Sequence, residues 1–369
     1  MALDEVRNRT AMVQVILTIP DDLTTFAWQA WERWQSTQAE LQSPYFTPEF
    51  TQAVSLVRDD VEIAQLFEAG ELVGVLPFQR GAFNLGKPVG GKLSDYHGVI
   101  GTPGLALDPG QIVRDCFLGA WDFEHVPKSQ ISFVPHAKCE GESPQLWLHE
   151  GFEHYCRDRK ASGSDVVAKT WQKARKLERE RGAVTLTVHD PSAEIFDLLV
   201  EWKRAQFART GIGDVLASDW TIQLLKNLLA SDSTALRGVM TVLRVDEKPV
   251  AICYSLRSRG VLHGWFTAYD RDFGAYSPGL ILFLKLAEVA EREGITLIDL
   301  GKGDERYKQS LASSSCSMME GSVTTNCLGV WLRARWRSTR TWLDQSAMKS
   351  MGGLPEKIVA PLRKWILND

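Results

Sequence analysis

The sequence has little that would tie it to a metal, a membrane or nucleic acid. Its six cysteines form no CxxC pair, and its net charge is −4, which gives no bulk attraction to DNA. No apolar run reaches the ~18 residues typical of a membrane-spanning helix. The N-terminal segment lacks a basic stretch followed by a long apolar run. We therefore expect no signal peptide and a cytoplasmic protein with reduced thiols.

The chain is long enough for two domains. It has 369 residues, of which 44% are hydrophobic, and domains usually take about 100–200 residues. A Ser/Gly-containing segment, ASGSD, stands near the middle and is typical of a linker. We predict one domain over residues 1–157, a second over residues 164–325, and a Trp/Arg-rich helical tail over residues 326–369.

A helix–helix–hairpin pattern occurs twice. In the first copy Thr47-Pro48 starts the second helix, and Ala69-Gly70 forms the turn of the hairpin. In the second copy Gly211 ends the first helix, Ser218 caps the second, and the hairpin turns at residues 246–248. The repeat predicts a tandem duplication of one fold.

The second copy continues with a strand, a helix that starts at Ser277-Pro278, and the strand ITLIDL. A strand reached through a helix implies a crossover and a mixed sheet. The expected fold class is therefore α/β with mixed sheets, in two tandem copies.

Two segments of the second copy combine glycines with polar residues. RDFGAYSPG leads into a helix N-terminus, which binds anions through free N–H groups and the helix dipole, although simple capping would need no ligand. DLGKGDERYK follows a buried strand and could supply a base, an acid and a cation, or could form a salt-bridged surface loop. Its polar side chains are Asp299, Asp304, Glu305, Tyr307 and Lys308.

The first copy carries one comparable segment, GGKLSDYHGVIG. Asp95, Tyr96 and His97 stand there between glycines, a pattern that suits substrate contacts and is equally typical of a plain turn.

Three further features have a functional and a structural interpretation. The histidines and cysteines of residues 136–156 fit no known zinc pattern, so we expect no metal. The basic helix 166–181 could contact the phosphates of a nucleotide sugar or form a solvated face. The tail could rest on the anionic surface of the inner membrane or pack on the core with its arginines outward.

Several of these motifs together resemble a known family. The segments PFQRG, GGKLSDYHGVI, KTWQKARKLERERG and AYDRDFGAYSPGLILFLKLAEVAEREGITLIDLGKGDERYK are similar to acetyltransferases of the cellulose-biosynthesis (CelD/BcsL-like) type. These belong to the GNAT superfamily and are related to the Fem-type aminoacyltransferases. The resemblance covers about residues 40–325. It implies two tandem GNAT-like folds and transfer of an acyl group from acetyl-CoA to a sugar in bacterial exopolysaccharide or cellulose pathways, without a metal.

The resemblance also implies roles for individual residues. Catalysis would fall to Asp304 or Glu305 as base, with Tyr307 and Lys308 at the acyl-transfer centre and Lys308 stabilising the oxyanion. The acceptor would be held by Asp95, Tyr96, His97 and Asp299. The CoA diphosphate would face the loop of Arg271, Gly274, Tyr276, Ser277, Gly279 and Leu280.

The donor loop departs from the family pattern at one position. Tyr276 replaces a small residue, and its side chain would obstruct the close approach of a diphosphate to the backbone. Together with the basic helix 166–181, this departure leaves open a Fem-type aminoacyltransferase that uses aminoacyl-tRNA. The Trp/Arg-rich tail leaves open a non-catalytic binding subunit of a polysaccharide assembly.

Overall fold

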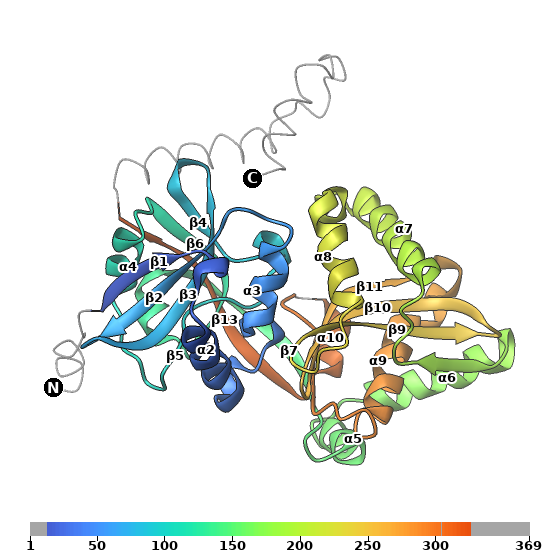
Figure 1. Cartoon of the computed structure of the whole chain (residues 1–369). Helices are drawn as coiled ribbons and strands as arrows, with labels where there is room; N and C mark the ends of the chain where they lie inside the picture. The colour runs from blue at the N-terminus through green and yellow to red at the C-terminus, as the bar shows by residue number, and fades with distance from the viewer. Residues whose placement is uncertain (1–12, 304, 326–369) are drawn as a thin grey trace, which may run out of the picture.

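The computed structural model describes residues 13–303 and 305–325, which form a mixed α/β fold around one 13-stranded sheet (Figure 1). The order of strands is β1-β2-β3-β4-β6-β13-β7-β12-β11-β10-β9-β8, and β5 pairs with β3. The mixed α/β class is confirmed. The predicted tail and the N-terminal residues 1–12 lie outside the described residues.

The strands are β1 (Gln14–Thr18), β2 (Val61–Glu68), β3 (Glu71–Gly81), β4 (Leu85–Lys87), β5 (Ile100–Gly101), β6 (Ala120–Pro127), β7 (Ala137–Trp147), β8 (Val184–Thr187), β9 (Arg237–Val245), β10 (Lys248–Ser258), β11 (Val261–Tyr269), β12 (Leu297–Asp299) and β13 (Ser314–Thr324). The helices are α2 (Thr25–Thr37), α3 (Pro48–Ser55), α4 (Pro109–Asp115), α5 (Phe152–Ala161), α6 (Val166–Arg181), α7 (Ala193–Thr210), α8 (Asp219–Leu229), α9 (Pro278–Val289) and α10 (Arg306–Leu311). Among the described residues no helix is both long and apolar enough to cross a membrane.

The predicted helix–helix–hairpin pattern is present twice, as α2-α3-β2-β3 and α7-α8-β9-β10. The Thr47 hydroxyl accepts a hydrogen bond from Phe50 N, and Gly211 ends α7 with a φ of +72°. Both hairpins turn through residues with positive φ, as a two-residue turn requires. Local caps and turns therefore fix where these elements begin and end.

The strands β9 and β10 are buried on both faces because helices cover both sides of the sheet. Figure 1 shows α7 and α8 above β9–β11 and α6 and α9 below them. Met240 and Val242 pack with α7 and α8, whereas Val239 and Leu243 pack with α6 and α9. This alternation explains the nearly continuous apolar sequence of these strands.

The sheet crosses from one half of the chain to the other at β7, β12 and β13. Strand β12 runs parallel to β11 and antiparallel to β7. The last strand, β13, pairs with both β6 and β7. The loop between β12 and β13 therefore lies where the two halves meet. The domain boundaries at residues 157 and 164 stay a prediction.

Candidate active site

Two glycines bring the loop after β12 against charged groups from both halves of the chain. Gly301 has a φ of +73° and Gly303 a φ of +159°, a region that favours glycine. A Cβ at Gly301 would stand 3.0 Å from Asp95 Oδ2, and a Cβ at Gly303 would stand 2.9 Å from Lys308 Nζ. Larger residues here would push the loop away from both charged groups.

Asp299, the last residue of β12, is the centre of a buried hydrogen-bond cluster. Its side chain is only 4% exposed, and each of its oxygens accepts two hydrogen bonds. The donors are Tyr96 Oη, Ser143 Oγ (2.6 Å), Gln145 Nε2 (2.9 Å) and Gly301 N (2.8 Å). A carboxylate has about four lone-pair sites, so this one is filled by protein donors. Asp299 therefore organises the cluster and, in this arrangement, has no oxygen left for a substrate.

A histidine that the sequence analysis missed connects Asp299 to Asp95. His263 on β11 has a fully buried side chain, and its Nε2 lies 2.8 Å from Asp95 Oδ2. Its Nδ1 lies 3.5 Å from Asp299 Oδ1. Asp95 comes from the first half of the chain and its side chain is 25% exposed. The imidazole thus stands between a buried carboxylate and one that solvent or a ligand can reach.

The electrostatics of Asp95 and His263 favour an ion pair. Burial disfavours the charge of His263, but the two neighbouring carboxylates outweigh it and raise the pKa of the imidazole. Burial also disfavours the charge of Asp95, but the hydrogen bond and charge of His263 outweigh it and lower the pKa of that carboxyl. Both shifts describe the same pair, an imidazolium against a carboxylate.

We expect this pair to give the protein a stability maximum between the two folded-state pKa values. The contribution of His263 is present below its ordinary pKa of about 6.5 and is lost as the pH rises through the raised folded-state value. The contribution of Asp95 is present above its ordinary pKa of about 3.9 and is lost as the pH falls through the lowered value. Urea unfolding at a series of pH values measures both limbs.

The variant His263→Gln should flatten the alkaline limb of that profile. His189→Gln is the control, because burial lowers the pKa of His189 and this residue therefore cannot supply stability of the same sign. If the alkaline limb were unchanged in His263→Gln, another group would be its source.

Lys308 is held by three acceptors at the other end of the loop. Its Nζ lies 3.3 Å from Gly301 O, 3.1 Å from Lys302 O and 3.2 Å from Glu305 Oε2. The Lys308 side chain is 10% exposed, whereas that of Glu305 is 56% exposed. The three N–H groups of the ammonium are thus all occupied. Of the three acceptors, the exposed Glu305 carboxylate is the one that a ligand could displace at least cost.

Two further predicted catalytic residues belong to this segment. Tyr307 precedes Lys308 in α10, and burial, followed by the charge of Glu305, raises its pKa, so its hydroxyl stays protonated. Asp304 lies outside the described residues, and its predicted role as a base stays a prediction.

His97 faces a different environment from Asp95 and Tyr96. Its Nε2 accepts hydrogen bonds from the backbone N–H groups of Glu124 and His125, both at 3.0 Å. Burial, together with the charges of His125 and Lys302, lowers the pKa of His97 well below its usual range. The ring is therefore neutral and carries its proton on Nδ1.

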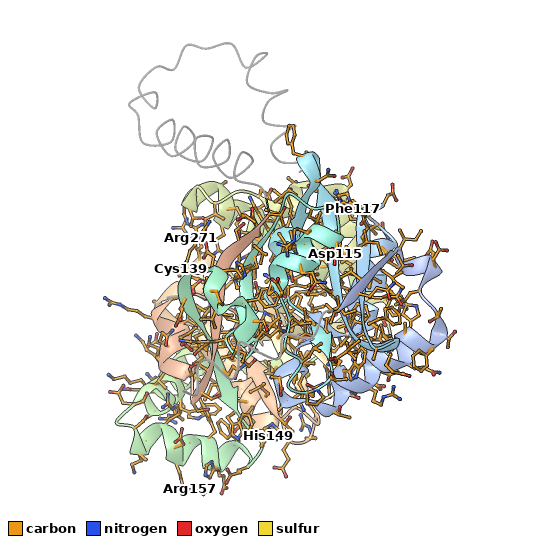
Figure 2. The ribbon with its side chains drawn as sticks, turned by 90° about the vertical axis from the view of Figure 1, so that its left-hand side faces the viewer. Asp115, Phe117, Cys139, His149, Arg157 and Arg271 are labelled. Atoms are coloured by element: carbon orange, nitrogen blue, oxygen red, sulfur yellow. The ribbon has the colours of Figure 1, made fainter. Side chains whose placement is uncertain are left out.

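The predicted donor loop lies where β11 leads into α9. Gly274 and Gly279 have little around them, the nearest atoms to an added Cβ being 3.8 Å and 4.0 Å away. Arg271, labelled in Figure 2, is exposed. Ser277 caps the helix with a left-handed φ of +57°, and Leu280 N bonds to its carbonyl. The backbone of Gly274 and Gly279 is thus open to a ligand.

The structure does not bear out the expected obstruction by Tyr276. Its side chain is 8% exposed and packs against α6, where its hydroxyl donates to Glu180 at 2.9 Å. Lys176 of the same helix lies over the Tyr276 ring, and Lys173 Nζ donates to Ser277 Oγ at 2.8 Å. The basic helix therefore brings cations to the N-terminus of α9, in a geometry that suits a diphosphate.

Strand β11 is irregular beside the cluster. Tyr254 pairs with Phe266 and Ser255 with Gly264, so Trp265 is an extra residue on β11. Its indole Nε1 donates to Leu93 O of the first half at 2.9 Å. Bulges of this kind interrupt strand pairing and are frequent next to active sites.

A second residue missed by the sequence analysis is Lys203 on α7. Its Nζ donates to Gln206 Oε1 at 3.2 Å and to Thr267 O at 3.5 Å. Burial lowers its pKa, and the charge of Lys308 adds to this shift. Lys203 gave no signal in the sequence, because the six lysines and arginines of α6 form a more conspicuous basic run.

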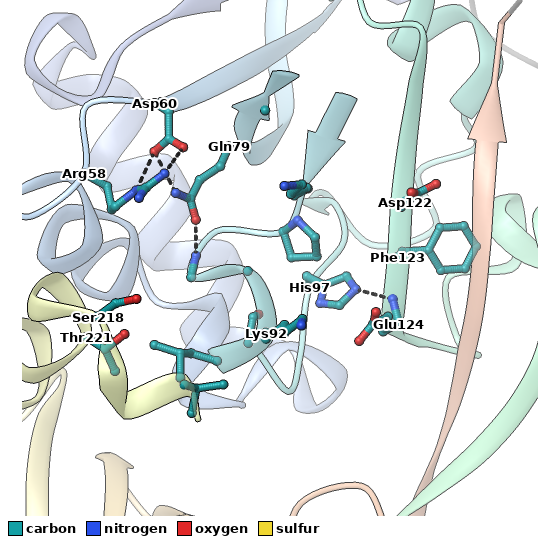
Figure 3. Close-up of a pocket in the computed structure, with 18 of the residues that line it drawn as sticks. Arg58, Asp60, Gln79, Lys92, His97, Asp122, Phe123, Glu124, Ser218 and Thr221 are labelled. Atoms are coloured by element: carbon teal, nitrogen blue, oxygen red, sulfur yellow. Dashed lines mark hydrogen bonds and ion pairs between the residues drawn. The ribbon is translucent and has the colours of Figure 1, made fainter. Parts of the chain in front are cut away.

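A large pocket adjoins the cluster, with a volume of about 880 Å³. Figure 3 shows its lining, which comes from β3, the loop of residues 87–97, β6 and the start of α8. His97 and Ser94 belong to the lining, and the two residues between them, Asp95 and Tyr96, belong to the buried cluster. The pocket and the cluster therefore share one segment of chain.

Among the described residues no group of three or more His, Cys, Asp or Glu side chains could hold a metal ion. Cys139 lies within β7 and His149 follows the end of that strand, at well-separated places in Figure 2. A strand rises about 3.3 Å per residue, which keeps such positions apart.

The chain is similar to known proteins in part of its sequence and in its fold. Residues 164–309 match the model of the acetyltransferase (GNAT) domain. FemX is similar over 86% of this chain and 99% of its own, with 10% identity and a TM-score of 0.52. The C-terminal domain of a protein assigned as a lysylphosphatidylglycerol synthetase from Agrobacterium fabrum is similar over 78% of this chain and 90% of its own, with 12% identity and a TM-score of 0.50. No curated protein matches the sequence.

These matches define the class of the fold. Residues 164–309 are similar to the acetyltransferase (GNAT) domain, and the chain shares its fold with FemX. The identities near 10% show the fold alone, so the cellulose-biosynthesis type, the substrate and the pathway are matters for a proposal.

Proposed function

We propose that this protein transfers an acetyl group from acetyl-CoA to an amine or hydroxyl of a sugar, or of a nucleotide- or lipid-linked sugar. The observation that supports the proposal is the meeting of three charged groups at the end of β12: His263 and Lys308 of the matched domain and Asp95 of the first half of the chain. The assignment to bacterial exopolysaccharide or cellulose biosynthesis rests on the sequence resemblance.

The reaction is a direct attack of the acceptor on the thioester carbonyl. The new bond joins the acceptor nitrogen or oxygen to the acetyl carbon, and the acceptor's proton passes to a carboxylate. Glu305 is the described candidate for this base, with Asp304 beside it in sequence. Collapse of the oxyanion breaks the C–S bond, and the CoA thiolate leaves and takes up a proton from solvent.

Lys308 stabilises the oxyanion in this scheme. Its ammonium exchanges the contact with the exposed Glu305 for the developing negative charge, while the two carbonyls of the loop keep it in place. The same exchange frees Glu305 to accept the proton of the acceptor.

The diphosphate of the donor is expected at the N-terminus of α9. The open backbone of the loop and Lys173 beside Ser277 support this placement. Lys173→Gln should weaken the binding of acetyl-CoA about fivefold to tenfold, because one hydrogen-bonded contact contributes roughly 1 kcal/mol to the binding free energy. Calorimetric titration of acetyl-CoA measures the change, and Lys226→Gln on α8 is the control.

The same titration separates the two candidate donors. The basic helix α6 beside the donor loop would also suit aminoacyl-tRNA, which is the second candidate. Binding of charged tRNA with no binding of acetyl-CoA would favour an aminoacyltransferase. If neither donor bound, the acyl-transfer proposal would fail. The third alternative, a binding subunit with a membrane-facing tail, rests on residues outside the described part.

A further inference from the structure

The pocket beside the cluster is large enough for more than a single sugar ring. Ligand sites in proteins usually span about 300–1,000 Å³, and this one measures about 880 Å³. Its walls come from both halves of the chain and include Lys87 and Lys92 of the first half and the first turn of α8 of the second. A ligand bound there would contact both halves at once.

The first turn of α8 offers polar groups that the protein itself does not use. Thr221 is 1% exposed, and its hydroxyl makes no hydrogen bond with the described residues. Ser218, the N-cap, makes no side-chain capping bond either. Figure 3 shows both hydroxyls directed toward the space between α8 and the loop of Lys92. Both hydroxyls can therefore donate to, or accept from, a ligand or water in the pocket.

His97 supplies a second such group. Its Nε2 already accepts two backbone N–H groups, so the proton is on Nδ1. That Nδ1 is buried and has no hydrogen-bond partner in the described part of the chain. A neutral imidazole with a free N–H can donate to a hydroxyl or a phosphate oxygen.

Some charged side chains of the pocket lining are paired within the protein, and others are not. Asp60, Arg80 and Asp214 are paired within the protein. The side chains of three lysines and two carboxylates make no hydrogen bond or ion pair with the described residues: Lys87, Lys92, Lys138, Glu124 and Asp219. Lysine ammonium groups suit a phosphate group, and carboxylates suit sugar hydroxyls, which are donors.

We propose that this pocket binds a sugar that carries a phosphate group, such as a nucleotide-linked sugar or a sugar 1-phosphate. The phosphate lies toward Lys87 and Lys92, and Thr221, Ser218 and His97 Nδ1 bond to the polar groups of the ligand. The inference rests on the proposed function in one respect, since it makes this pocket the acceptor site. The segment 94–97, which lines the pocket and includes Asp95, would then place the bound sugar near Asp95.

Calorimetric titration of the full chain without acetyl-CoA tests the site. The probes are UDP-glucose, glucose 1-phosphate, UDP and glucose. We expect the phosphorylated sugars to bind at least tenfold more tightly than glucose. Added salt should lower the affinity for the phosphorylated sugars. Equal affinity for UDP-glucose and glucose 1-phosphate would indicate that the pocket recognises the sugar phosphate alone. Tighter binding of UDP-glucose would show that the pocket also contacts the nucleotide.

Two variants locate the binding. Thr221→Val keeps the volume but removes the hydroxyl, and Lys92→Gln removes a cation from the exposed loop; each should weaken UDP-glucose several-fold. Thr170→Val is the matched control, because Thr170 is equally buried, at 1%, on the remote α6. Equal binding in all variants, or no binding of either phosphorylated sugar at millimolar concentration, would overturn the inference.

A parallel titration with acetyl-CoA separates this inference from the proposed function. Binding of acetyl-CoA without sugar phosphate would refute the pocket assignment alone. Binding of sugar phosphate without acetyl-CoA would leave the pocket in place and remove the donor.

Discussion

Lys308→Ala is expected to lower the transfer of acetyl by about 10²–10³-fold, the usual cost of removing one donor from an oxyanion site. In the present geometry the Lys308 ammonium has two loop carbonyls and one exposed carboxylate as acceptors. Only the carboxylate contact can be exchanged for a substrate without disturbing the loop. The loss should appear in kcat, with little change in the affinity for acetyl-CoA, because the oxyanion exists only in the transition state.

Release of the CoA thiol, followed with the phosphorylated sugars as acceptors, measures the effect. Lys302→Ala is the matched control, since Lys302 belongs to the same loop but bonds to Glu124 O of the first half and to Glu320 of β13. Thermal unfolding should show that Lys308→Ala still folds. Turnover near that of the unsubstituted chain would remove Lys308 from the mechanism.

The sequence predicted those parts of the fold that depend on local chemistry. Thr47 caps α3, Gly211 ends α7, and the hairpin turns lie at the expected residues, since each needs only neighbours within a few positions. Glycines and charged residues after a buried strand are visible in the sequence, and on them rests the prediction of a site in the loop after β12, which stays a prediction.

The partners of that loop could not be predicted in the same way. His263 lies in an apolar strand and resembles an ordinary core residue until Asp95 and Asp299 are placed beside it. Ser143 and Gln145 on β7 are 156 and 154 residues away from Asp299 in sequence. Such contacts follow from the order of strands across the sheet, which periodicity does not specify.

The donor loop shows how packing can reverse a local argument. A tyrosine in place of a small residue predicts obstruction if its side chain stays beside the backbone. The side chain of Tyr276 instead packs on α6 and bonds to Glu180, which leaves the loop open. The rule about small residues concerns the space next to the backbone, and α6 provides another place for the ring.

Asp299 links the site to the stability of the whole sheet. Its donors come from the segment of Tyr96, from β7 and from the loop after β12, so one carboxylate joins three segments that are distant in sequence. Since the donors are buried, their hydrogen bonds cannot be replaced by water without opening the junction. The junction between the two halves is thereby coupled to the geometry of Asp95 and His263.

Asp299→Asn is accordingly expected to lower the free energy of unfolding by about 3–5 kcal/mol, the range observed when one partner of a buried ion pair is removed. The asparagine amide presents an NH₂ group where one carboxylate oxygen now accepts two donors, and His263 loses one of its two carboxylates. Urea unfolding followed by tryptophan fluorescence measures the change.

Ser143→Ala is the matched control, because it removes one donor and leaves the carboxylate with three others. It should cost about 1.5–3 kcal/mol, as for one hydrogen bond to a charged group. The comparison tests the central role of Asp299, since the loss should be clearly larger when the shared acceptor is changed than when one donor is removed. Equal losses in the two variants would mean that the Ser143 contact alone, and not the four-donor cluster, holds the junction together.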